Sequence, residues 1–91
     1  MKVVWTDTAK RNLRTIHDYI AQGSPTYAKR TVDRLTSRSE QIGTFPLSGR
    51  VVPEFAFGQI REVFERPYRI IYHIRPESIE VIGVVHMSRR I

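Results

Sequence analysis

The second half of the sequence contains seven charged or imidazole side chains that could act together on a phosphodiester. They are Arg50, Glu54, Arg61, Glu62, Arg69, His73 and His86. Cleavage of RNA without a metal requires a base for the 2′-hydroxyl, a cation for the phosphorane and an acid for the leaving 5′-oxygen. The set contains all three kinds of group, but the same residues would also serve as plain ion pairs. Residue types alone leave both interpretations open.

The motifs of most other enzyme classes are missing from the sequence. It has no glycine-rich phosphate loop and no G-x-S-x-G motif, and His17, His73 and His86 are too scattered to indicate a metal site. It also has no cysteine, which excludes a disulfide framework and is typical of a reducing compartment. We therefore expect no metal and no cofactor.

Length and charge limit the size of the fold and the class of partner. The 91 residues carry a formal net charge of +6, which favours an anionic partner such as nucleic acid, the ribosome or an acidic protein segment. No apolar run approaches the roughly 20 residues that span a bilayer, and the N-terminal MKVVWTDTAK lacks a signal-peptide pattern. We expect one cytoplasmic domain, residues 1–91, that does not bind a membrane.

Three consecutive strand-like segments carry most of the candidate residues. Ile60–Arg66, Tyr68–Arg75 and a segment that ends at His86 are rich in β-branched and aromatic residues with near-alternating polarity. A turn over Arg75–Ser78 sets the register of the last two strands. It would pair Ile74 with Ile79, Tyr72 with Val81 and Ile70 with Gly83.

This register divides the side chains between the two faces of the sheet. The expected core face carries Tyr68, Ile70, Tyr72, Ile74, Ile79, Val81 and Val85. The opposite face carries Arg69, Ile71, His73, Glu80, Ile82, Val84 and His86. This second face is too polar for a dry interior and too apolar for a solvated surface, so it is where we expect a functional site.

Two helices are expected between a first strand at Lys2–Trp5 and these segments. The first follows a cap at Thr6, Asp7 or Thr8 and ends at Gly23; the second begins with Ser24 as N-cap and Pro25 at the first helical position. Its apolar stripe ends at Gly43, so the two helices form a hairpin that covers the core face. The expected core includes Val4, Leu13, Ile16, Ile20, Val32, Leu35, Ile70, Tyr72 and Val81.

Arg30, Arg34 and Arg38 recur at intervals of four residues along the outer face of the second helix. Such a stripe is either a solvated face or a docking surface for an acidic partner. The connection from Thr44 to Gln59 is long and rich in apolar residues. We expect it to be fixed on the sheet edge, with strand pairing at Val51–Val52, and to hold Arg50 and Glu54 there.

The order of these segments resembles the ParE/RelE toxin superfamily of bacterial toxin–antitoxin modules over essentially the whole chain. The resemblance is carried by Phe45-Pro46 with Gly49-Arg50, Pro53-Glu54, Ile60-Arg61-Glu62, Pro67-Tyr68-Arg69 and a last strand that ends in His86 before a short basic tail. It implies a small α+β domain of order β-α-α-β-β-β, in which the helical hairpin packs on one face of a largely antiparallel, twisted sheet.

The resemblance also implies a function and a set of partners. The long hairpin with few lysines is more similar to the ParE branch, encoded by plasmid stabilisation modules, whose members poison DNA gyrase and are neutralised by a ParD-like antitoxin, commonly a ribbon-helix-helix protein. On this chain the target-binding surface would be the basic segment His86–Arg90, including Arg89, with Arg61 and Arg69 in support. Arg30, Arg34 and Arg38 would bind the antitoxin.

The alternative within the superfamily is a ribosome-dependent mRNA interferase similar to RelE and YoeB. The YoeB pattern would assign the base to Glu54, the electrostatic stabiliser to Arg69 and the acid to His86. The sequence departs from this pattern, because Met87-Ser88 stands where that group has a terminal tyrosine and the lysine cluster of RelE-like nucleases is missing. A third possibility is a chain that binds an antitoxin without being toxic.

Overall fold

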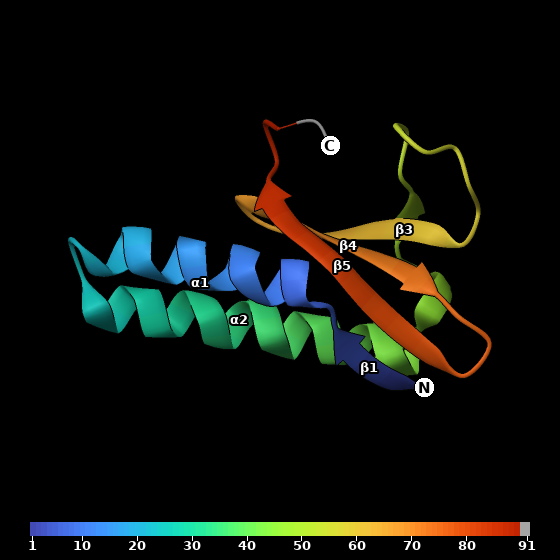
Figure 1. The fold of residues 1–91 in the computed structure, drawn as a ribbon, viewed down its shortest axis with the longest axis horizontal. Helices are drawn as coiled ribbons and strands as arrows, with labels where there is room; N and C mark the ends of the chain where they lie inside the picture. The colour runs from blue at the N-terminus through green and yellow to red at the C-terminus, as the bar shows by residue number, and fades with distance from the viewer. Residues whose placement is uncertain (90–91) are drawn as a thin grey trace.

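Two antiparallel helices cover one face of a five-stranded sheet in the computed structural model, which describes residues 1–89 (Figure 1). The elements are β1 (Lys2–Trp5), α1 (Asp7–Ala21), α2 (Pro25–Thr44), the 3-10 turn η1 (Pro46–Ser48), β2 (Arg50–Val51), β3 (Ile60–Glu65), β4 (Tyr68–Ile74) and β5 (Ser78–His86). The sheet order is β1-β5-β4-β3-β2, and only the β1–β5 pair is parallel. The predicted α+β fold is confirmed, with one additional short strand. None of the helices within residues 1–89 is long and apolar enough to cross a bilayer.

Side-chain caps determine where the two helices begin. The Thr6 hydroxyl accepts a hydrogen bond from the Ala9 N–H at 3.2 Å and donates one to the Val81 carbonyl at 3.0 Å, so the cap of α1 is also attached to β5. The Ser24 hydroxyl accepts from the Tyr27 N–H at 3.1 Å, and a proline occupies the first turn of α2. The predicted cap of α2 is confirmed, and Thr6 is the cap that α1 uses.

The sequence pattern predicted that α2 ends at Gly43. In the structure, Gly43 lies inside the last turn of α2. A Cβ atom at this position would be 2.5 Å from the Met1 carbonyl oxygen and 2.9 Å from Cγ2 of Val3. The Met1 amino group donates to the Gly43 carbonyl at 2.6 Å. Gly43 therefore allows β1 to approach α2 closely, and this packing role explains the glycine better than helix termination does.

The core lies between the helical hairpin and the inner face of the sheet. Leu35, Ile70, Tyr72 and Val81 are fully buried, as predicted, while Leu13 and Ile16 pack against the core with partial exposure. Ile20 and Val32 are also only partly buried, and the distal end of the hairpin extends beyond the sheet (Figure 1). Val4 was wrongly predicted to be a core residue: it is 40% exposed. Its neighbours Val3 and Trp5 pack against the core, so strand alternation turns Val4 to the opposite face.

A β-bulge in β5 changes the predicted register halfway along the β4–β5 pair. Ile74 pairs with Ile79 and Tyr72 with Val81, as predicted, but Ile71 pairs with Gly83, so Ile82 is left without a partner. The prediction that Ile70 pairs with Gly83 is therefore wrong. An extra residue reverses the facing of every later side chain in the strand.

The bulge places the residues of β5 that follow Ile82 on the face of the sheet opposite to the one predicted. Val84 pairs with Ile70 and is buried in the core, whereas Val85 pairs with Arg69 on the outer face. His86 pairs with Tyr68, which packs against the core cluster from the helix side. Val84, Val85 and His86 each lie on the face opposite to the one predicted.

The connection between α2 and β3 follows the edge of the sheet. Arg50 pairs with Glu62 and Val51 with Arg61, so β2 extends the sheet one residue before the predicted Val51–Val52 pairing. The Val52 N–H then donates to the Ile60 carbonyl at 3.2 Å, and the Ile74 N–H donates to Gln59 at 2.7 Å. The loop is thus attached at both ends, and its middle lies against the outer face.

Candidate functional site

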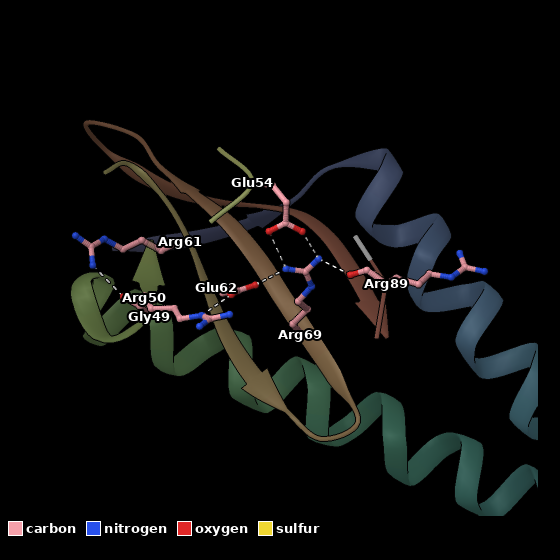
Figure 2. Close-up of polar contacts among 7 residues, drawn as sticks. All are labelled: Gly49, Arg50, Glu54, Arg61, Glu62, Arg69 and Arg89. Carbon is pink, nitrogen blue, oxygen red and sulfur yellow. Dashed lines mark hydrogen bonds and ion pairs between the residues drawn. The ribbon is translucent and has the colours of Figure 1, made fainter. Parts of the chain in front are cut away.

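Four charged residues form a cluster on the face of the sheet opposite the helices (Figure 2). This charge cluster consists of Arg50 on β2, Glu54 in the loop, Glu62 on β3 and Arg69 on β4. Strand register explains the convergence: Arg50 is opposite Glu62, and Arg69 is opposite Phe64 two residues further along β3. Side chains two residues apart on a strand share a face.

Arg69 is the centre of the charge cluster and is 5% exposed. Its Nη1 donates to Glu62 at 2.8 Å, its Nη2 donates to Glu54 at 2.7 Å, and the same Nη2 donates to the Arg89 carbonyl at 2.6 Å. Hydrogen bonding to Glu54, followed by that to Glu62, raises the pKa of Arg69 against the opposing effect of burial. The guanidinium group therefore remains charged. Both of its terminal nitrogens are bonded to the protein, while its Nε is buried without a hydrogen-bond partner among the described residues.

Glu62 is a buried carboxylate held between two arginines. It is 1% exposed, and the Arg50 Nε donates to its second oxygen at 2.6 Å while Arg69 binds the first. The Arg50 guanidinium carbon also lies 5.0 Å from the centroid of the Phe64 ring, a cation–π distance. A buried carboxylate requires such pairing, because an unpaired charge in the interior is strongly unfavourable.

The charge cluster also fixes the segment that follows β5. Arg69 donates to the Arg89 carbonyl. In addition, the Met87 N–H donates a hydrogen bond to the Pro67 carbonyl at 2.8 Å. The Arg89 side chain points away from Arg69 (Figure 2). Arg90, which the sequence also placed in the target-binding segment, lies outside the described residues.

His86 does not join the charge cluster. Because of the bulge it lies on the helix side of the sheet, where its ring is 6.0 Å from that of Tyr68 and its Nδ1 is 2.8 Å from the Ser88 hydroxyl. The structure thus brings together two of the three residues assigned by the YoeB pattern, Glu54 and Arg69, and separates the third. The expectation that all three share one face is wrong.

A groove of about 500 Å³ lies beside His86, between α1 and the end of β5. It is lined by Asn12, Thr15, Ile16, Tyr19, Tyr68, Val84, Val85, His86, Ser88 and Arg89. Asn12 has a structural role that the sequence analysis missed, because its side-chain oxygen accepts from the Val84 N–H at 3.1 Å just after the bulge. No sequence pattern signals this contact, since the bulge itself was not predicted.

Arg61 lies apart from Arg69, because its side chain is on the opposite face of the sheet from that of its neighbour Glu62. Its Nη1 donates to the Gly49 carbonyl at 2.9 Å and its Nε to the Gly58 carbonyl at 3.0 Å. These bonds connect the two ends of the loop, so Arg61 holds the loop in shape. His73 also lies away from the cluster, 3.9 Å from Glu80 and with its ring 6.2 Å from that of Phe57.

Tyr72 is a second residue whose role the sequence did not indicate beyond core packing. Its hydroxyl donates to the Pro46 carbonyl at 2.6 Å and accepts from the Gly49 N–H at 3.0 Å. Burial is the main cause that raises the pKa of Tyr72. Tyr72 thereby attaches η1 to the sheet, and Gly49 is required beside it, because a Cβ atom there would lie 2.6 Å from the hydroxyl.

The arginine stripe of Arg30, Arg34 and Arg38 lines a shallow groove on α2 together with Glu65. Arg34 is already engaged, since its Nε is 3.3 Å from Glu65 and its Nη2 donates to the Arg66 carbonyl at 2.7 Å. Arg38 contacts the Gln41 side chain at 3.3 Å. Arg30 makes no ion pair within the part of the chain that the structure describes.

Among residues 1–89, no three histidine or acidic side chains come close enough together to hold a metal ion.

Comparison with known proteins identifies the class to which this fold and these residues belong. Residues 3–91 match the family described as the ParE toxin of the type II toxin–antitoxin system parDE, and the chain is a member of that family. It is 34% identical over 89 residues to Toxin RelE2 of Caulobacter vibrioides, with 97% of each chain covered. The fold is also that of the chromosomal ParDE toxin–antitoxin system from P. aeruginosa, with a TM-score of 0.78 at 20% identity over 94% of this chain and 95% of that one.

The protein is accordingly the toxin of a type II toxin–antitoxin system, and its partner is an antitoxin. The family places this chain among toxins without fixing the molecule that it attacks, because relatives with both ParE and RelE names match it.

Proposed function

We propose that this toxin inhibits DNA gyrase through a binding surface and performs no covalent chemistry, and that a ParD-like antitoxin of the ribbon-helix-helix type neutralises it. The observation that supports this proposal is the state of the charge cluster. Arg69, which would have to stabilise a phosphorane, is 5% exposed and bonded to two carboxylates and a backbone carbonyl. The Arg69 Nε has no hydrogen-bond partner within the described residues, but that atom is itself buried. A phosphate could therefore reach the guanidinium group only after a rearrangement of the charge cluster.

The proposed gyrase-binding surface is the segment His86–Arg89 that follows and includes the end of β5. His86, Ser88 and Arg89 are exposed, and Arg69 positions the segment through the Arg89 carbonyl. Arg69 is thus assigned a supporting role in target binding without touching the target itself. Arg61 supports the neighbouring loop rather than this segment.

A ribosome-dependent mRNA interferase is the second candidate. It is favoured by the contact between Glu54 and Arg69 at 2.7 Å, the two residues that the YoeB pattern assigns as base and stabiliser. It is disfavoured by the position of His86, since a general acid has to reach the same scissile bond as the base. For this candidate to hold, a conformational change on the ribosome would have to free Arg69.

An in vitro gyrase supercoiling assay run beside a ribosome-bound mRNA cleavage assay tests the proposal. We expect the purified toxin to inhibit supercoiling and to leave the mRNA intact. His86→Gln should weaken gyrase inhibition only a few-fold, since one exposed contact contributes about 1 kcal/mol. Cleavage of ribosome-bound mRNA that falls by about 10²- to 10⁴-fold in His86→Gln would instead identify a general acid and refute the gyrase proposal.

The arginine stripe is the part of the surface that we propose for the first encounter with the antitoxin. Support comes from the cationic side chain of Arg30, which is not ion-paired within the described residues, and from the net charge of +6. Charge of this kind accelerates association with an acidic partner more than it strengthens the final complex.

A further inference from the structure

Glu54 is the member of the charge cluster that comes from the loop between β2 and β3. Its carboxylate faces the end of the Arg69 side chain (Figure 2), with Oε2 2.7 Å from Nη2 and Oε1 3.4 Å from Nη1. A carboxylate that bridges both terminal nitrogens of a guanidinium group fixes the orientation of that group as well as its position. The Glu54 side chain is 19% exposed, so most of its surface is shielded from water.

The other contacts of Arg69 would not fix the plane of its guanidinium group by themselves. Its Nη1 donates to Glu62 at 2.8 Å, whereas its Nε is buried without a hydrogen-bond partner within residues 1–89. The Nη2 group carries two N–H bonds. It donates to Glu54 and, at 2.6 Å, to the Arg89 carbonyl. Without Glu54, the guanidinium group could turn about its contact with Glu62 and leave the Arg89 carbonyl.

The segment that follows β5 depends on this bond for its position. Within the described residues, two hydrogen bonds join it to elements other than β5. The Met87 N–H donates to the Pro67 carbonyl, and Arg69 donates to the Arg89 carbonyl. The Arg89 N–H donates back to the His86 carbonyl at 2.9 Å, which shapes a turn but does not attach the turn to the sheet. Arg69 therefore provides the attachment at the far end of the segment.

The loop that carries Glu54 has an uncommon conformation. Ala56, two residues further on, has a φ of 51°, a left-handed value that is unfavourable for a residue with a Cβ atom. Such a conformation persists only where the surrounding contacts enforce it. The Ala56 N–H donates to the Val52 carbonyl at 3.0 Å, and Glu54 attaches the loop to Arg69. The same ion pair thus connects a strained loop with the segment after β5.

We propose that Glu54 is a positioning residue for the target-binding segment His86–Arg89. Through Arg69 it holds the Arg89 carbonyl, so the conformation of the loop between β2 and β3 determines how the segment is presented. The proposal rests on the proposed function, which assigns this segment to gyrase binding. Neither Glu54 nor Arg69 has to touch the target in this role. An ion pair with a structural role alone would instead stabilise the whole sheet and leave the segment no more mobile than the strands when it is lost.

Amide hydrogen exchange of the free toxin tests the coupling without any target. Glu54→Gln keeps the size of the side chain but removes its charge and one of its two acceptor oxygens. We expect the amides of Met87 and Arg89 to exchange at least about tenfold faster in this variant, with the amides of the β4–β5 ladder unchanged. Unchanged exchange at Met87 and Arg89 would overturn the proposal. Equal acceleration at the ladder amides would also overturn it, because it would indicate a general loss of stability.

Glu80→Gln is the matched control. It removes the same charge from a carboxylate that is 37% exposed and lies 3.9 Å from His73, near the start of β5. We expect exchange at Met87 and Arg89 to remain at the wild-type rate. An acceleration equal to that in Glu54→Gln would show that net charge governs the segment and would contradict a specific role of Glu54.

Arg69→Lys separates the geometry of the guanidinium group from its charge. Lysine keeps the cation but places its donors on a single nitrogen, so it cannot reproduce the bidentate contact. This variant should accelerate exchange at Met87 and Arg89 as Glu54→Gln does. The double variant should be no faster than either single one, because both substitutions remove the same contact. A segment that stays protected in Arg69→Lys, or additive effects in the double variant, would overturn the proposed chain of contacts.

Gyrase inhibition tests the link from the segment to function. Apparent affinity falls in proportion to the fraction of molecules that are competent to bind. Glu54→Gln should therefore inhibit supercoiling several-fold less than the wild type, and Glu80→Gln should inhibit it equally well. Full inhibition by a Glu54→Gln variant whose segment exchanges faster would overturn the positioning role. A wild-type toxin that does not inhibit gyrase would refute the proposed target instead, and growth arrest on expression of the same variants would then decide the role of Glu54, with the same order of potency expected.

Discussion

At the scale of single residues, Arg69 connects the loop, the sheet and the segment after β5. Replacing it with alanine would leave the buried Glu62 with Arg50 as its one remaining partner and would release both Glu54 and the Arg89 carbonyl. Breaking a buried ion pair from one side typically costs about 3 to 5 kcal/mol. We expect Arg69→Ala to lower the free energy of unfolding by an amount in this range, measured by chemical denaturation.

Arg50→Ala is the control for this prediction. The Arg50 side chain is 58% exposed, and Glu62 would keep its bond to Arg69. Solvent-exposed partners contribute about 0 to 1 kcal/mol, so the stability loss should be several-fold smaller. Similar losses in the two variants would contradict the central role assigned to Arg69.

The Tyr72 hydroxyl supports a prediction about pH. Burial raises the pKa of Tyr72 above that of an exposed tyrosine, so folding favours the neutral phenol. The stabilisation is complete below the unfolded-state pKa of about 10 and is lost as pH rises through the higher folded-state pKa. Tyr72→Phe should lower stability by about 1 to 3 kcal/mol at neutral pH, because the Gly49 N–H and the Pro46 carbonyl lose their partner.

The same substitution should also make unfolding less sensitive to alkali. Measuring the free energy of unfolding between neutral pH and pH values above 10 checks both effects. The conserved shape of phenylalanine keeps the ring packing, so a variant with unchanged stability at every pH would show that the two hydrogen bonds contribute nothing.

At the scale of secondary-structure elements, the contact between β1 and α2 depends on Gly43. Gly43→Ala would place Cβ 2.5 Å from the Met1 carbonyl oxygen and 2.9 Å from Val3. Overpacking of this kind typically costs about 1 to 3 kcal/mol, and we expect a corresponding drop in melting temperature. At Gly58 the same substitution meets no atom within 4 Å, so Gly58→Ala should leave the melting temperature unchanged within about 1 °C.

The elements also show what local sequence signals could and could not predict. Helix caps such as Ser24–Pro25 and turns such as Arg75–Ser78 are short-range features, and their consequences near the turn, including the Ile74–Ile79 pair, were predicted correctly. The bulge at Ile82 has no such signal, because Ile82 fits the strand pattern as well as its neighbours do. Next to the bulge, the Asn12 side chain on α1 accepts a hydrogen bond from the Val84 N–H, a long-range contact that the local sequence pattern does not indicate. Because the extra residue Ile82 was not predicted, His86 was assigned to the wrong face of the sheet.

The charge cluster was partly predictable for a related reason. Alternation along β3 and β4 is local, so placing Arg69 on the outer face required only the correct strands. That Glu54 would reach Arg69 depends on the path of a loop in which Ala56 has a positive φ of 51°. The sequence of the loop contains no signal for this conformation, because a positive φ is uncommon for a residue other than glycine.

At the scale of the whole molecule, the arginine stripe should affect how fast the antitoxin arrives. Replacing Arg30, Arg34 and Arg38 with glutamate should slow association by about tenfold or more at low salt and flatten its dependence on ionic strength. Stopped-flow or surface-based kinetics at several salt concentrations measure both quantities. An unchanged on-rate and salt slope would mean that the stripe is only a solvated face.

Arg34 requires its own control, because it is bonded to Glu65 and Arg66. The pair Arg30→Glu/Arg38→Glu leaves that contact intact and should retain most of the kinetic effect. If only the triple variant slows binding, damage to the α2–β3 contact is the cause, and the stripe has no direct role.

The parallel pairing of β1 with β5 has a consequence for synthesis of the toxin. Lys2 pairs with Ser78 and Trp5 with Val81, so the first strand finds its place only after the last strand has been made. Such long-range pairing is slow to form, and a nascent chain would still expose its unpaired strands while β5 remains within the ribosome. Products of interrupted translation that end before β5 would therefore lack both the closed sheet and the segment that Arg69 holds. In this topology, a cell would acquire a folded toxin only after β5 has been synthesised.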